Sequence, residues 1–69
     1  MDLAAARLQA AIEGLSEGQR VAFLLNRIEG KKHKEIAEML GISQKAVEKR
    51  IYSALKEISE KVGKLPFYR

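Results

Sequence analysis

The sequence predicts an all-α fold: a small four-helix domain that contains a helix-turn-helix. In every segment the apolar residues recur at spacings of three and four positions, and strand-like alternation is missing from the pattern. Glycines at positions 14, 30, 41 and 63 separate these segments. We therefore expect one domain over residues 1–69, with helices at about 2–13, 16–29, 33–40 and 44–62.

The first two segments carry recognisable helix ends. The first is rich in alanine, the strongest helix former, and Gly14 is expected to end it as a C-cap with positive φ. Ser16 and Gln19 have the spacing of a capping box at the start of the second segment. Phe23 lies off the centre of the core stripe of this helix; it is expected to pack against another helix, with an exposed contact as the alternative. That stripe consists of Val21, Leu24, Leu25 and Ile28.

The last two segments form a short helix and a long one. Ile36 and Ala37 give the short helix an apolar edge, Ser43 is suited to cap the long helix, and Pro66 stops it. The core stripe of the long helix consists of Val47, Ile51, Leu55, Ile58 and Val62. The apolar residues of the tail are expected to fold back onto the bundle; they are Leu65, Phe67 and Tyr68.

The composition excludes several classes of function. The 69 residues include no cysteine, so the chain has no disulfide, no cysteine zinc site and no cysteine nucleophile. No apolar run is long enough to span a membrane, and the first residues lack the pattern of a signal peptide. No nucleophile–base pair or metal-ligand set is visible. We expect a cytoplasmic, non-enzymatic module without a cofactor or a small-molecule substrate.

The positive charge lies in the second half of the chain. The net charge is +4, of which residues 1–29 contribute −1 and residues 30–69 contribute +5. Residues 44–56 alone carry +3. A local excess of this kind indicates a nucleic-acid partner, with an ordinary solvated helical surface as the alternative.

The third and fourth segments have the features of a helix-turn-helix. Ala37 is small where two helices must cross, and Gly41 permits a left-handed turn. Ile42 is expected to insert into the core, and Ser43 to cap the last helix. The outer face of that helix would then be free to enter a DNA major groove, about 12 Å wide. That face carries Gln44, Lys45, Glu48, Lys49 and Tyr52. An ordinary αα-hairpin is the alternative.

A series of short motifs extends this pattern over most of the chain. They are Leu15, Gln19-Arg20, Phe23-Leu24-Leu25, Glu29-Gly30, Glu35-Ile36-Ala37, Leu40 to Ser43, Val47 and Ala54-Leu55. Together they resemble region four of sigma-70-like RNA polymerase sigma factors, most closely the extracytoplasmic-function group, over roughly residues 4–60.

The resemblance implies a function in bacterial transcription initiation. Its family recognises the promoter −35 element as double-stranded DNA, docks on the flap of the RNA polymerase β subunit, and in many members is captured by an anti-sigma factor. The family's other DNA-reading domain, which handles the −10 element, has no counterpart in these residues. The resemblance therefore implies one part of a larger initiation factor.

The resemblance also assigns roles to residues. Positions where the family reads bases or contacts the nearby backbone are occupied by Glu48, Lys49, Tyr52 and Ser53. Positions where phosphate contact is usual are occupied by Lys45 and Arg50. The full expected DNA-binding set is Lys32, Lys34, Ser43, Gln44, Lys45, Glu48, Lys49, Arg50, Tyr52, Ser53 and Lys56.

Three positions depart from the family pattern. Ser16 stands where the family often has proline, although a serine caps the helix by another route. Lys32 stands where a capping serine or threonine is common, and a lysine at a helix N-terminus opposes the helix dipole. Because a bound phosphate would reverse that penalty, we expect Lys31, Lys32 and Lys34 to hold DNA phosphate. Glu48 stands where a basic residue is frequent. Its carboxylate can accept from cytosine N4, which leaves the base preference open.

Three further features are expected to have a structural or a DNA-binding role rather than a role in metal binding or catalysis. His33 is the only histidine, and with no second ligand it is expected to pack at the start of the third helix rather than bind a metal. Glu35 and Glu38 are expected to be solvated beside lysines. Tyr52 has lysines on both sides of it on one face, which favours contact with a DNA groove over a place in the core.

Two other functions compete with the sigma-factor interpretation. A helix-turn-helix effector domain of a LuxR-like response regulator shares the Glu-Ile-Ala, Gly-Ile-Ser and Val motifs, but dimerises through its last helix and lacks the Leu-x-x-x-Gln-Arg helix. The other candidate is a protein-interaction module, in which an apolar groove between the first two helices binds a partner helix, for example of an anti-sigma factor.

Overall fold

The structure, a computed structural model, describes residues 3–62 and shows four helices joined by short turns. They are α1 (Leu3–Glu13), α2 (Glu17–Arg27), α3 (His33–Leu40) and α4 (Gln44–Val62). The predicted all-α, four-helix fold is confirmed. The predicted contacts of the tail, and the helix stop at Pro66, lie outside the described residues.

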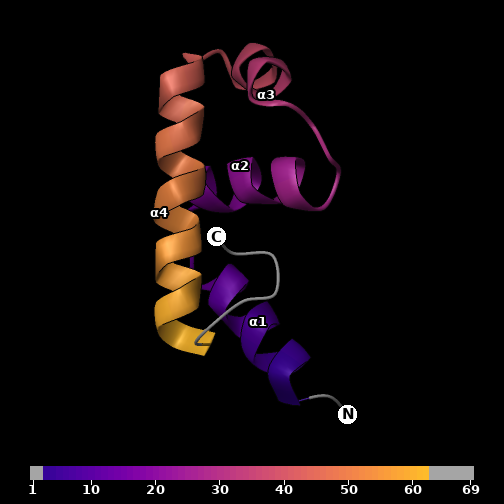
Figure 1. Ribbon diagram of the computed structural model, residues 1–69, viewed down its shortest axis with the longest axis vertical. Coiled ribbons are helices and arrows are strands. Elements are labelled where there is room, and N and C mark those ends of the chain that lie inside the picture. The colour runs from indigo at the N-terminus through magenta and orange to yellow at the C-terminus, as the bar shows by residue number, and fades with distance from the viewer. Residues whose placement is uncertain (1–2, 63–69) are drawn as a thin grey trace.

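Helix α4 is the element on which the other three are assembled. Its 19 residues make it about 28 Å long, and α1, α2 and α3 follow one another along one side of it (Figure 1). Each of the three packs against α4. Within residues 3–62, the opposite side of α4 therefore carries no other helix, and its exposed residues can meet a large partner.

The core is apolar and draws on every helix. The largest fully buried side chains are Phe23, Ile36, Val47 and Ile58. Burying a side chain of this size contributes about 1.5–3 kcal/mol, which is a large share of the stability of so small a domain. The expectation that Phe23 packs inside the bundle is confirmed, because none of its surface is exposed.

The predicted core stripe of α2 is right in part: Leu24 and Leu25 pack against the core, but Ile28 does not. Ala22 and Phe23 are the buried residues of this helix, whereas Ile28 is 70% exposed. The rest of the predicted stripe is half-buried: Val21, Leu24 and Leu25. Residues 21–25 are all apolar and cover more than one face of the helix, so their spacing alone could not identify the face that turns inward.

The ends of the helices are partly as predicted. The capping box is confirmed: the backbone N–H of Gln19 donates to Ser16 Oγ at 3.3 Å, and the backbone N–H of Ser16 donates to Gln19 Oε1 at 3.1 Å. The positive φ expected at Gly14 is wrong. Among the glycines of the described chain, only Gly30 and Gly41 have positive φ, and Gly14 continues the helical hydrogen bonding of α1.

Candidate nucleic-acid interface

The turn between α3 and α4 sets the angle at which the two helices meet. Gly41 ends α3 in the left-handed conformation, with φ 69° and ψ 34°. The backbone N–H of Ile42 donates to Ala37 O at 3.0 Å, and the Ile42 side chain packs against the core. Ala37 itself is buried. The roles predicted for these three residues are therefore confirmed.

Helix α4 starts from a side-chain cap. Ser43 Oγ accepts a hydrogen bond from the backbone N–H of Ala46 at 3.1 Å, and Ser43 O accepts one from Val47 N at 3.1 Å. The predicted cap is confirmed. It fixes the backbone of the first turn of α4, and with it the start of the segment that carries Gln44 and Lys45.

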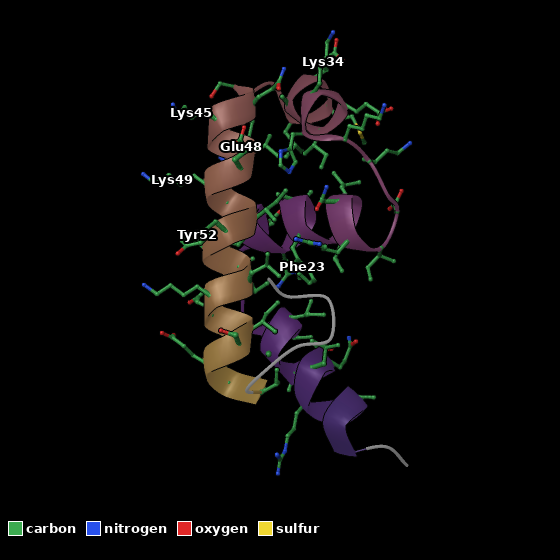
Figure 2. All side chains as sticks on the ribbon, in the orientation of Figure 1. Phe23, Lys34, Lys45, Glu48, Lys49 and Tyr52 are labelled. Carbon is green, nitrogen blue, oxygen red and sulfur yellow. The ribbon has the colours of Figure 1, made fainter. Side chains whose placement is uncertain are left out.

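The exposed face of α4 brings most of the predicted site residues together. Val47 and Ile51 turn toward the core. Figure 2 shows Lys45, Lys49 and Tyr52 projecting from α4 on the side away from the other helices. Tyr52 is 64% exposed, which rules out its alternative placement in the core. The exposed residues of this face are Gln44, Lys45, Glu48, Lys49, Tyr52 and Lys56.

Helix α3 contributes a further lysine close to the start of this face. Lys34 and Gln44 line the same shallow hollow, which lies between α3 and the start of α4. The other residues of the hollow are Ala37, Glu38, Gly41 and Ile42. The structure therefore brings Lys34, on the scaffold helix, next to the first residue of α4.

The start of α3 lacks a side-chain cap from its own N-cap residue. Lys32 is exposed there and its side chain caps nothing, but its backbone N–H donates to Glu35 Oε1 at 2.8 Å. Lys31 O accepts a hydrogen bond from Asn26 Nδ2 at 3.0 Å, which ties the incoming loop to α2. The lysine side chains at this helix start are thus attached to an ordered backbone.

Arg50 lies apart from the exposed lysines. Its side chain is half-buried on the flank of α4, where it packs over Gly18 in the first turn of α2. A Cβ atom at Gly18 would come within 3.0 Å of Arg50 Nη1. Ser53 is also half-buried. The structure therefore does not bring Arg50 to the surface that carries Lys45 and Lys49.

A separate apolar groove runs between α1 and α2, where the sequence predicted one. Its volume is about 500 Å³, and its apolar lining includes Leu8, Ile12, Leu24 and Ile28. Gln9, Glu13 and Arg20 supply its polar lining. Arg20 Nη1 also donates to the carbonyl oxygens of Glu13 and Leu15, both at 3.3 Å, which fixes the end of α1. Leu24 packs against the core and also lines this groove, whereas Ile28 lines the groove and is largely exposed.

The described part of the chain shows neither a metal-ligand cluster nor a membrane-spanning helix. No group of three or more His, Cys, Asp or Glu residues between positions 3 and 62 is placed to hold a metal ion. His33 is half-buried at the first position of α3. None of the four helices combines the length and the apolar character needed to cross a bilayer.

Comparison with known proteins identifies the family. The family model described as Sigma-70, region 4 matches residues 5–63, which include the helix-turn-helix and nearly all of the two helices before it. Searches of curated proteins and of solved structures find no significant match. The chain belongs to the sigma-70 region 4 family, the DNA-binding domains of sigma factors that act in transcription initiation.

Proposed function

We propose that this domain recognises the promoter −35 element by inserting α4 into the major groove of duplex DNA. The observation that carries the proposal is the exposed face of α4, where Lys45, Lys49 and Lys56 lie opposite the core. A helix of this kind fits a major groove about 12 Å wide. Membership of the sigma-70 region 4 family supports the same function.

Lysines on two helices supply the attraction to DNA. Lys45 and Lys49 lie one helical turn apart on α4, and Lys34 reaches the same end of the domain from α3. Lys32 stands at the N-terminus of α3, where the helix dipole also attracts anions. In this proposal these four residues contact backbone phosphates and hold the domain in register.

Arg50 has a different role in this proposal. Its side chain packs over Gly18, so it holds the start of α2 against α4 and contributes to DNA binding only through its charge. Ser43 also acts indirectly, because its hydroxyl caps α4. Ser53 and Lys56 follow Tyr52 along the helix and border the contact.

The groove between α1 and α2 is the proposed docking site for the flap of the RNA polymerase β subunit. Apolar grooves of this type bind the apolar face of an amphipathic helix. Ile28, 70% exposed at one end of the groove, gives such a helix an apolar contact that the isolated domain leaves uncovered. An anti-sigma factor that covered this groove would compete with the polymerase. The family match favours this function over a LuxR-like effector domain.

The DNA-binding proposal is tested by titrating a fluorescently labelled pool of random-sequence duplexes at several salt concentrations. Each phosphate contact should steepen the fall of log K with log salt by about 0.9. Four lysine contacts therefore predict a slope of about −3.6. Binding that does not change with salt, or no binding to duplex DNA at low salt, would contradict the proposal.

A further inference from the structure

The exposed face of α4 consists of two parallel rows with different chemistry. Gln44, Glu48 and Tyr52 follow one another at intervals of four residues, so they form one row along the helix. Lys45 and Lys49 form the adjacent row at the same interval. The second row is cationic and suits phosphate. Lys56 continues the first row by one more interval, but the three residues before it carry no positive charge, so attraction to phosphate does not explain them.

Glu48 is the residue of the first row that most needs an explanation. It is exposed, it is the only acidic residue between positions 44 and 56, and no hydrogen bond or ion pair joins it to another residue of the described chain. A carboxylate facing DNA repels phosphate and every acceptor in the groove. It fits there only where a base presents a donor. In the major groove these donors are the amino groups of cytosine and adenine.

The hydrogen-bond acceptor beside the amino group distinguishes adenine from cytosine. Adenine presents its N7 acceptor beside its amino donor, and that lone pair would face the same carboxylate. Cytosine presents a donor without such an acceptor, and its partner guanine presents the acceptors O6 and N7. Lys45 precedes Glu48 by three residues, so the two side chains are neighbours on the helix surface. The positive charge of Lys45 offsets part of the repulsion between the Glu48 carboxylate and the nearby phosphates.

We propose that Glu48 reads the cytosine of one C·G base pair. Glu48 accepts a hydrogen bond from cytosine N4, while Lys45 beside it contacts the backbone phosphate. This inference rests on the proposed function, because it requires α4 to lie in the major groove. It assigns to this domain a specific base preference, and it gives the Glu48 carboxylate a role in DNA recognition.

The test is a selection from a duplex pool with randomised base pairs, carried out in parallel with wild type, Glu48→Gln, Lys45→Ala and Glu60→Gln. Wild type should enrich C·G at one position. Glu48→Gln should switch that position toward adenine, because glutamine pairs with adenine N6 and N7. The C·G preference there should fall by roughly 5- to 150-fold, the range expected for one base contact. Lys45→Ala should weaken binding to every sequence and leave the C·G preference in place, because a phosphate contact does not read bases.

Glu60→Gln is the matched control, because it removes the same charge from an exposed position near the far end of α4. It should leave the enriched sequence unchanged. If Glu48→Gln selects the same sequence as wild type, or Glu60→Gln shifts it equally, the inference is overturned while the proposed function stands. If wild type enriches no sequence at all, both are overturned. Thermal melts of each variant confirm that all four proteins are folded.

Discussion

The guanidinium group of Arg50, on α4, lies over Gly18, the second residue of α2. A Cβ atom at Gly18 would approach Arg50 Nη1 to 3.0 Å, so the missing side chain leaves room for the arginine. One flank of α4 therefore holds the start of α2, while the exposed face of the same helix stays free. On this one helix, Arg50 points toward α2 and packs against it, whereas the side chains of the exposed face point away from the other helices (Figure 2).

Replacing Gly18 with alanine tests this contact. Alanine favours a helix over glycine by roughly 1 kcal/mol, and the flexible end of Arg50 can move aside. We expect a net stabilisation of less than about 1 kcal/mol, or a rise of a few degrees in Tm. The gain should be larger when Gly18→Ala is made in an Arg50→Ala background, where nothing needs to move. Equal effects in both backgrounds would show that the contact has no energetic consequence.

Replacing Gly41, in the turn between α3 and α4, is expected to destabilise the fold. The φ of Gly41 is 69°, and a Cβ atom there would meet nothing within 4 Å, so any cost comes from the backbone alone. Gly41→Ala should lower the free energy of unfolding by roughly 1–2 kcal/mol, measured by urea denaturation. Gly41→Asn should cost less, because asparagine tolerates the left-handed conformation. Identical losses for the two variants would contradict this explanation.

The lysine row of α4 is expected to set the salt dependence of DNA binding. The double substitution Lys45→Gln and Lys49→Gln should reduce the slope of log K against log salt by about 1.8, since each lost phosphate contact accounts for about 0.9. Arg7→Gln, on the exposed surface of α1, is the control and should leave the slope unchanged. Fluorescence anisotropy at four or more salt concentrations measures both. A slope that changed equally for Arg7→Gln would indicate general charge effects rather than contacts on α4.

The groove between α1 and α2 is expected to bind the polymerase flap through Ile28. Ile28→Glu places a charge in the groove at a position that is 70% exposed, so the fold should survive the change. We expect the affinity for an isolated β flap fragment to fall by about 10-fold or more, since an unpaired charge would be buried in the contact. Met39→Glu is matched to it, because Met39 is 57% exposed and lies outside the groove. Weakening by both variants alike would argue against this groove as the docking site.

Local signals allowed much of the fold to be predicted from the sequence. The capping residues Ser16 and Ser43 act on backbone groups within a few positions of themselves, and Gly41 is required by a single turn. Such effects depend little on the rest of the chain. The inward face of α2 could not be predicted, because residues 21–25 are all apolar and only the packing of α1, α3 and α4 decides which of them is buried.

The candidate interface was predicted best where side-chain direction follows from helical spacing alone. Lys45, Lys49 and Tyr52 lie opposite the core stripe of α4 and are exposed as that spacing requires. Arg50 could not be placed in this way, because it lies on the border between the core and the exposed face. Its direction depends on the space that Gly18 leaves on a different helix.

The most direct test of the central claim compares two duplexes. Wild-type protein is titrated by fluorescence anisotropy, at one fixed salt concentration, with a duplex enriched from a random pool and with a scrambled duplex of the same composition. Because each mismatched base pair costs about 1–3 kcal/mol, we predict that the enriched duplex binds at least about 10-fold more tightly. Equal affinity for the two duplexes would contradict the claim that α4 reads promoter sequence.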